Sequence, residues 1–213
     1  MTEPHQDQPV ETRGAPLSAA RAAVVLVHGR GATAASILEM ADEFAHDDVA
    51  YLAPQAAGNE WYPESFLAPV ERNEPGRSSG LRAIDDLVTE ADAAGVPPER
   101  VLVLGFSQGA CLASEYVART PRRYGGLAAL SGGLIGETID PDSFEGDLSD
   151  TPAFLGCSDR DPHIPAERVH ESAAVLEDRG ADVTVRLYEG MGHGVNQDEI
   201  ERVDEMVASL LGS

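Results

Sequence analysis

One serine in the sequence stands where it could act as a nucleophile. The stretch GFSQGA, residues 105–110, holds Ser107 between two glycines spaced as G-x-S-x-G, directly after the apolar run at 101–104. This motif has chemical meaning when a strand precedes it and a helix follows it, because the serine then lies on a sharp, strained turn with its hydroxyl exposed. The apolar spacing of residues 108–120 is that of a helix. The pattern therefore predicts a serine that attacks acyl carbonyls.

A nucleophilic serine needs a general base and a carboxylate that orients the base. Behind a G-x-S-x-G turn these residues follow the serine in the order acid, then histidine. GCSDRDPHIP, residues 156–165, offers Asp159 and Asp161, and EGMGHG, residues 189–194, offers His193 between two glycines. The proline after Asp161 restricts that residue to extended or turn conformations. We expect Asp161 to be the acid, with Asp159 as the alternative, because sequence does not resolve strand-end geometry to two residues.

The oxyanion of a tetrahedral intermediate needs two backbone N–H donors. One should come from Gln108, the residue after the nucleophile, and the other from Arg30 in the turn HGRGA, residues 28–32. Only the amide of Arg30 is required, so its guanidinium is available to steer anionic substrates or to pair with a nearby carboxylate. We expect His28 to be structural and to hold this turn through its ring nitrogens.

A long segment rich in proline, glycine and asparagine, residues 55–77, shows little pattern of its own. Long loops in compact domains are usually functional, so we expect its Trp61 and Phe66 to bind substrate. His163 is expected to line the site or its rim, and pairing it with Asp159 in a metal site is the weaker interpretation. The cysteines have no metal-ligand spacing and are expected to be buried. We predict no metal and no cofactor.

Strand and helix patterns alternate along the chain. Strands are expected at residues 22–28, 49–54, 100–106, 125–132, 152–157 and 182–189, and helices at 33–45, 78–95, 108–120, 166–180 and 196–211. Such alternation predicts an α/β fold with a mostly parallel central sheet and helices on both faces. Ligands bind beyond the carboxyl ends of such strands. We expect a disordered tail over residues 1–8 and a single domain over residues 9–213.

The charge balance of the chain is strongly acidic. Its 213 residues include 37 Asp and Glu and 15 basic residues, all of them arginine, which gives a net charge of −22. Concentrated salt screens the repulsion within such a surface, so we interpret it as adaptation to high salt rather than as an ordinary acidic protein. The charge also argues against nucleic-acid binding. Neither a signal peptide nor an apolar run of about 20 residues is found, so we expect a cytoplasmic protein without stable membrane association.

Taken together, four motifs resemble the phospholipase/carboxylesterase family of α/β-hydrolases, which includes acyl-protein thioesterases and small bacterial carboxylesterases. They are HGRGA at 28–32, GFSQGA at 105–110, DRDPHIP at 159–165 and GMGHGV at 190–195. The likeness covers roughly residues 14–211, and no segment is long enough for a large lid. The resemblance implies an acyl pocket built partly from the loop that carries Trp61. It also implies a nucleophile, an acid, a base and two oxyanion donors at Ser107, Asp161, His193, Arg30 and Gln108.

We therefore expect a serine carboxylesterase that hydrolyses small-molecule esters of small to medium acyl chains through an acyl-enzyme. The first alternative is an acyl thioesterase or a lysophospholipase, which would prefer thioesters or long acyl chains. Arg30 stands where many acyl-protein thioesterases carry an apolar residue, and this departure speaks against the deacylation of lipidated proteins. The second alternative is a non-catalytic binding protein of the same fold. A homodimer is suggested by the resemblance alone.

Overall fold

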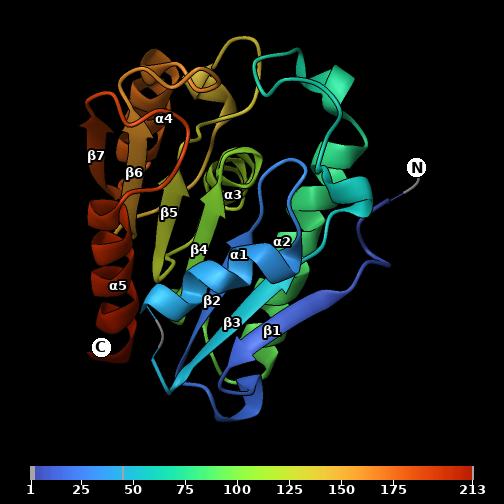
Figure 1. Cartoon of the computed structure of the whole chain (residues 1–213), viewed down its shortest axis with the longest axis vertical. Coiled ribbons are helices and arrows are strands. Elements are labelled where there is room, and N and C mark those ends of the chain that lie inside the picture. The colour runs from blue at the N-terminus through green and yellow to red at the C-terminus, as the bar shows by residue number, and fades with distance from the viewer. Residues whose placement is uncertain (1–2, 45, 213) are drawn as a thin grey trace.

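The computed structural model describes residues 3–44 and 46–212, which fold around a seven-stranded sheet (Figure 1). The strands lie in the order β1-β3-β2-β4-β5-β6-β7, and only β1 runs antiparallel to its neighbour. Their bounds are β1 Val10–Gly14, β2 Ala22–Val27, β3 Val49–Pro54, β4 Val101–Phe106, β5 Gly126–Leu130, β6 Pro152–Ser158 and β7 Asp182–Tyr188.

Helices cover both faces of the sheet. In Figure 1, α1 and α5 lie in front of it and α2, α3 and α4 lie behind it, and each layer has its own buried apolar cluster. Strands β2 and β3 are buried at every position, which explains why β2 consists of Val, Leu and Ala alone and why β3 has no charged residue. Among the described residues, no helix is long and apolar enough to cross a membrane. The helices are α1 Ala34–Met40, α2 Gly76–Ala93, α3 Gln108–Arg119, α4 Ala166–Asp178 and α5 Gln197–Gly212.

The expected α/β architecture is confirmed, and most elements lie within two residues of their predicted bounds. The helix expected over 33–45 is shorter, because α1 ends at Met40 and continues as a 3₁₀ turn over Ala41–Phe44; residue 45 lies outside the described residues. Strand β1 has no signature in the sequence. All five of its residues are exposed, and it pairs only with β3 at the sheet edge, so no apolar alternation is required of it.

The N-terminal segment differs from the disordered tail expected over residues 1–8. Residues 1–2 lie outside the described residues, but residues 3–8 pack against the protein and bury His5. The His5 ring accepts the Ala57 N–H at Nδ1 and donates to the Trp61 carbonyl from Nε2, each over 3.0 Å. Burial lowers the pKa of His5, which favours the neutral ring that this bonding requires. The tail prediction is therefore wrong for residues 3–8, which are tied to the loop after β3.

Candidate active site

Ser107 occupies the turn between β4 and α3 in a strained backbone conformation. Its φ is 56° and its ψ is −119°, a combination that a residue with a side chain adopts only where the surrounding structure imposes it. The surroundings are tight: a Cβ on Gly105 would lie 2.2 Å from the Gly109 carbonyl oxygen, and one on Gly109 would lie 2.0 Å from that of Val27. The two glycines of the motif thus allow the close approach of strand and helix that holds Ser107 at the strand end.

The three predicted triad residues meet at one edge of the sheet. His193 Nε2 lies 2.9 Å from Ser107 Oγ, and His193 Nδ1 lies 2.7 Å from Asp161 Oδ2. Because a carboxylate accepts at Nδ1, the ring proton sits there and Nε2 is free to accept the serine proton. The residues follow β4, β6 and β7, so the topology rather than the chain sequence brings them together.

The contacts of the two candidate aspartates differ. The side chain of Asp161 is buried and bonds the His193 ring, whereas Asp159 Oδ1 accepts the backbone N–H of Gly190 over 2.8 Å. Asp159 thus braces the turn that carries the histidine. Burial alone would raise the pKa of Asp161, but bonds from the His193 ring and from two backbone N–H groups outweigh it and hold that pKa below its usual 3.8.

The two predicted oxyanion donors flank the candidate nucleophile. Gln108 is the first residue of α3, where backbone N–H groups lack helical partners. The turn that carries Arg30 is close to Ser107, since a Cβ on Gly29 would lie 3.4 Å from that of Ser107. Within residues 3–44 and 46–212, no protein acceptor is described for the N–H of Arg30 or of Gln108. Both amides are therefore available to an oxyanion.

His28 holds this turn, as expected. Its ring is fully buried, donates from Nδ1 to the Gly29 carbonyl over 2.8 Å and accepts the Ala56 N–H at Nε2 over 3.1 Å. Burial lowers the pKa of His28, so the ring stays neutral and both bonds persist. Its role is to fix the backbone of the turn next to Arg30.

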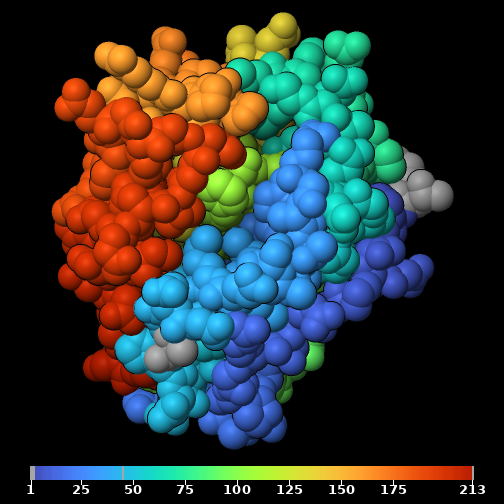
Figure 2. All heavy atoms as spheres, in the orientation of Figure 1, coloured from blue at the N-terminus to red at the C-terminus, as the bar shows by residue number. Residues whose placement is uncertain are grey.

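A cavity of about 470 Å³ opens onto Ser107 and His193. Figure 2 shows this side of the molecule hollowed between the orange and red C-terminal segments and the teal segment after β3, with green residues at the floor. Phe66 and His163 line the cavity, as predicted, and the His163 ring stands edge-on to His193 with centroids 4.9 Å apart. Tyr62, Glu64 and Ile164 also line it, and these residues carry no signal in the sequence beyond their place in two loops.

Trp61 does not line the cavity, so the prediction that it binds substrate is wrong. Its side chain is fully buried, and its indole N–H donates to the His28 carbonyl over 2.9 Å. The rings of His5 and His28 each lie 5.1 Å from it. The largest aromatic side chain of the loop gains most from full burial, and the residues that follow it, 62–66, form the cavity wall instead.

The cysteines are not candidates for chemistry. Cys111 and Cys157 are free and buried, and burial raises the pKa of each thiol to about 12. Both stay protonated and act as small apolar side chains. Among the described residues, no group of three or more His, Cys, Asp or Glu side chains could hold a metal ion.

Glu199, at the start of α5, is a buried carboxyl close to the loop of His193. Its Oε2 accepts the Asn196 N–H over 2.9 Å, and its own N–H donates to Asn196 Oδ1 over 3.0 Å. Its Oε1 is buried and has no hydrogen-bond partner among the described residues. Burial raises the pKa of Glu199 to about 7, so the folded protein favours the protonated form.

This raised pKa predicts a pH-dependent stability that a single substitution removes. The contribution of Glu199 is fully present below its unfolded pKa of 4.5 and is lost as the pH rises through its folded value of about 7. We expect Glu199→Gln to change the free energy of unfolding more favourably at pH 8 than at pH 4.5, by about 3 kcal/mol. Urea unfolding at both pH values measures this. Glu201→Gln, at an exposed position, is the control. If the stability of the two variants depended equally on pH, the raised pKa that we assign to Glu199 would be contradicted.

Comparisons with known proteins identify a family and relatives of the same fold. Residues 13–211 match a family model described as Phospholipase/Carboxylesterase. A crystal structure of a phospholipase/carboxylesterase from Dyadobacter fermentans is 43% identical, with a TM-score of 0.91 over 96% of this chain and 97% of that one. Acyl-protein thioesterase 1 from Saccharomyces cerevisiae is 26% identical over 93% of this chain and 97% of its own length. The same-named protein from Kluyveromyces lactis is 32% identical over 64% of this chain, a match that spans 61% of that relative.

Proposed function

Since the chain belongs to the phospholipase/carboxylesterase family of α/β-hydrolases, which makes it a carboxylic ester hydrolase, we propose that it is a serine carboxylesterase for small to medium acyl chains. The observation that carries the proposal is the chain of hydrogen bonds from Asp161 through His193 to Ser107. No other side chain arrangement among the described residues joins a nucleophile, a base and an orienting acid at the cavity.

In the proposed mechanism, Ser107 Oγ attacks the ester carbonyl while His193 Nε2 takes the hydroxyl proton. Asp161 keeps the proton on Nδ1 and stabilises the imidazolium that forms. The amides of Arg30 and Gln108 stabilise the tetrahedral oxyanion, and α3 directs its positive end toward it. The alcohol leaves with the proton from His193, and an acyl-enzyme remains on Ser107. Water, deprotonated by His193, then attacks the acyl-enzyme. The bond between the acyl carbon and Ser107 Oγ breaks as His193 returns the proton to Oγ, the acid is released, and the scheme needs no cofactor.

The cavity supports a substrate of moderate size. Its volume of about 470 Å³ is at the lower end of the range of small-molecule sites. Phe66 and Ile164 provide apolar wall, whereas Arg30, Glu64 and His163 make other parts polar. A mixed wall of this kind suits a short acyl chain better than a long one. Thioester hydrolysis is the second candidate, because the yeast relatives are named acyl-protein thioesterases and the same triad would cleave a thioester.

The test is hydrolysis of p-nitrophenyl esters from acetate to palmitate, alongside acyl thioesters of the same lengths, in molar KCl. We expect kcat/KM to peak at short to medium oxygen esters. A preference for long acyl chains or for thioesters would favour the thioesterase or lysophospholipase alternative. No turnover, combined with no labelling by a fluorophosphonate, would favour a non-catalytic binding protein.

We also propose adaptation to high salt, supported by the net charge of −22 and the absence of lysine. Screening should relieve the repulsion among surface carboxylates, so we expect the midpoint of thermal unfolding to rise by roughly 5 °C or more between 0.1 and 2 M KCl. Differential scanning calorimetry measures this shift. A variant with several exposed carboxylates changed to amides should respond less. A midpoint that stays constant across this salt range would contradict the proposal.

We also propose where the protein acts and how it assembles. A cytoplasmic location agrees with two cysteines that remain free thiols. A homodimer stays a prediction, which sedimentation equilibrium would test.

A further inference from the structure

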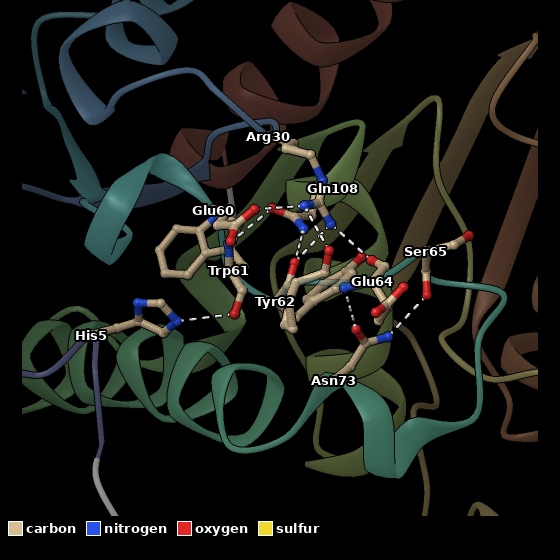
Figure 3. A network of polar contacts seen from close by, with 10 residues as sticks. His5, Arg30, Glu60, Trp61, Tyr62, Glu64, Ser65, Asn73 and Gln108 are labelled. Atoms are coloured by element: carbon tan, nitrogen blue, oxygen red, sulfur yellow. Dashed lines mark hydrogen bonds and ion pairs between the residues drawn. The ribbon is translucent and has the colours of Figure 1, made fainter.

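Arg30 contributes more to the site than its backbone amide. Its guanidinium makes four hydrogen bonds to the loop after β3, and Figure 3 shows it bridging across that loop. Nη1 donates to Glu60 Oε2 over 2.6 Å and to the Pro63 carbonyl over 3.0 Å. Nη2 donates to the carbonyls of Tyr62 and Glu64 over 2.7 and 2.8 Å. Three of the four acceptors are therefore main-chain carbonyls of consecutive residues.

These bonds occupy the Arg30 donors that an anionic substrate would otherwise use. Four donors of the guanidinium point at the protein, and Glu60 provides the opposite charge. Of the two roles that the sequence leaves open for this side chain, pairing with a local carboxylate is the one that its contacts support. An anionic substrate would have to compete with bonds that are already made.

The loop that Arg30 holds is the wall of the cavity. Residues 62–66 line the cavity and lie outside the helices and strands, so no regular secondary structure holds their backbone. Arg30 and Gln108 hold one side of this wall, with Gln108 accepting the Trp61 N–H and donating to the Tyr62 carbonyl. Asn73 holds the other side by accepting the Glu64 N–H over 2.9 Å. The Gly136 N–H also donates to the Phe66 carbonyl over 2.8 Å. The wall is thus fixed by bonds from other parts of the chain, chiefly from side chains, and has no secondary structure of its own.

We propose that the Arg30 side chain is a positioning residue that limits the acyl-chain range of the site by fixing the wall at residues 62–66. The inference rests on the proposed esterase function for its effect on substrates, but not for its effect on the loop. One residue then serves both parts of the site, because its amide faces the oxyanion and its side chain sets the wall. A planar guanidinium with five donors in a fixed fork suits carbonyls that converge from several directions.

The test compares three variants. Arg30→Met keeps the bulk of the side chain and loses every bond to the loop, and Arg30→Lys restores a charge but not the fork. Glu60→Gln is the matched control, because it removes only the ion pair and leaves the three carbonyl contacts. Thermal melts of all variants establish that the fold is kept.

The first readout is amide hydrogen exchange, which needs no enzymatic activity. In Arg30→Met we expect exchange at the protected amides of Trp61 and Glu64 to speed up by about tenfold or more, because the loop opens more often. Arg30→Lys should fall between Arg30→Met and the wild type, and Glu60→Gln should stay within about twofold of the wild type. Unchanged exchange in Arg30→Met would overturn the proposal, whether or not the protein hydrolyses any ester.

The second readout is kinetic. For Arg30→Met we expect KM for p-nitrophenyl butyrate to rise by about tenfold with kcat within about threefold, since a mobile wall weakens binding more than chemistry. The ratio of kcat/KM for decanoate to that for butyrate should rise, because the acyl site is less confined. A fall in kcat alone would mean that the side chain acts only through the oxyanion amide. A loss confined to mono-p-nitrophenyl glutarate, an anionic ester, would mean that it steers charge, and either result overturns the proposal.

If the wild type hydrolyses no ester or thioester, the proposed function fails while the exchange experiment still decides whether Arg30 fixes the wall. The two failures are therefore distinguishable.

Discussion

Ser107→Ala is expected to lower kcat for ester hydrolysis by about 10⁴-fold or more, because Ser107 Oγ is the one hydroxyl among residues 3–44 and 46–212 that hydrogen-bonds the His193 imidazole. The remaining rate would come from the oxyanion donors and from substrate binding alone. Pre-steady-state kinetics should show that the burst of p-nitrophenol disappears together with steady-state turnover. The free energy of unfolding should change little, since alanine keeps the Cβ and the backbone geometry.

Ser131→Ala is the matched control for this experiment. Ser131 follows the neighbouring strand β5, is fully buried and also has a positive φ, of 55°. Its Oγ lies 3.5 Å from the Gly194 carbonyl and bonds no ring nitrogen. We expect this variant to keep activity within about fivefold. Equal losses in both variants would mean that strained strand ends, and not the Ser107 hydroxyl, limit the rate.

Asp161→Asn is expected to lower kcat by about 10³- to 10⁴-fold with little change in KM. An amide at this position can donate to His193 Nδ1, which favours the tautomer with its proton on Nε2 and leaves that nitrogen unable to accept from Ser107. The other oxygen of the side chain can still accept the N–H groups of His163 and Ile164, so the loop should keep its shape. Steady-state kinetics and near-UV circular dichroism together separate loss of chemistry from loss of fold.

The matched control is Asp159→Asn, two residues away. Asp159 Oδ1 accepts the Gly190 N–H, and the amide oxygen of asparagine can accept the same N–H. We expect this variant to lose less than about tenfold in kcat. If it were as impaired as Asp161→Asn, the orienting role that we assign to Asp161 would be contradicted.

The candidate triad was predictable because each of its residues follows a strand that the apolar pattern already marks. Ser107 belongs to a G-x-S-x-G motif that follows four buried residues, and His193 lies between glycines after β7. Both positions at strand ends can therefore be inferred from the sequence. The choice between Asp159 and Asp161 depends on the course of one turn after β6, which the apolar pattern does not define. The contacts of each carboxylate distinguish the two candidates.

The contacts of the loop after β3 could not be predicted for a different physical reason. The loop sequence has no periodic spacing of apolar residues. It therefore does not predict that Trp61 is buried and that residues 62–66 face the cavity. Its conformation depends on long-range bonds from His5, Arg30 and Gln108, which are distant in the chain. Strand β1 and the buried His5 escape prediction similarly, since each is held by partners that local sequence does not encode.

The central claim is that Ser107 forms a covalent acyl-enzyme, and the most direct test is the site of modification by a fluorophosphonate probe. Trypsin releases residues 101–119 as one peptide that contains both Ser107 and Ser114, so tandem mass spectrometry must assign the modified residue. We predict one label per chain in the wild type, located on Ser107, with no label in Ser107→Ala and slow labelling in His193→Ala. A label on Ser114 or on any other residue, or labelling that persists in Ser107→Ala, would contradict the account.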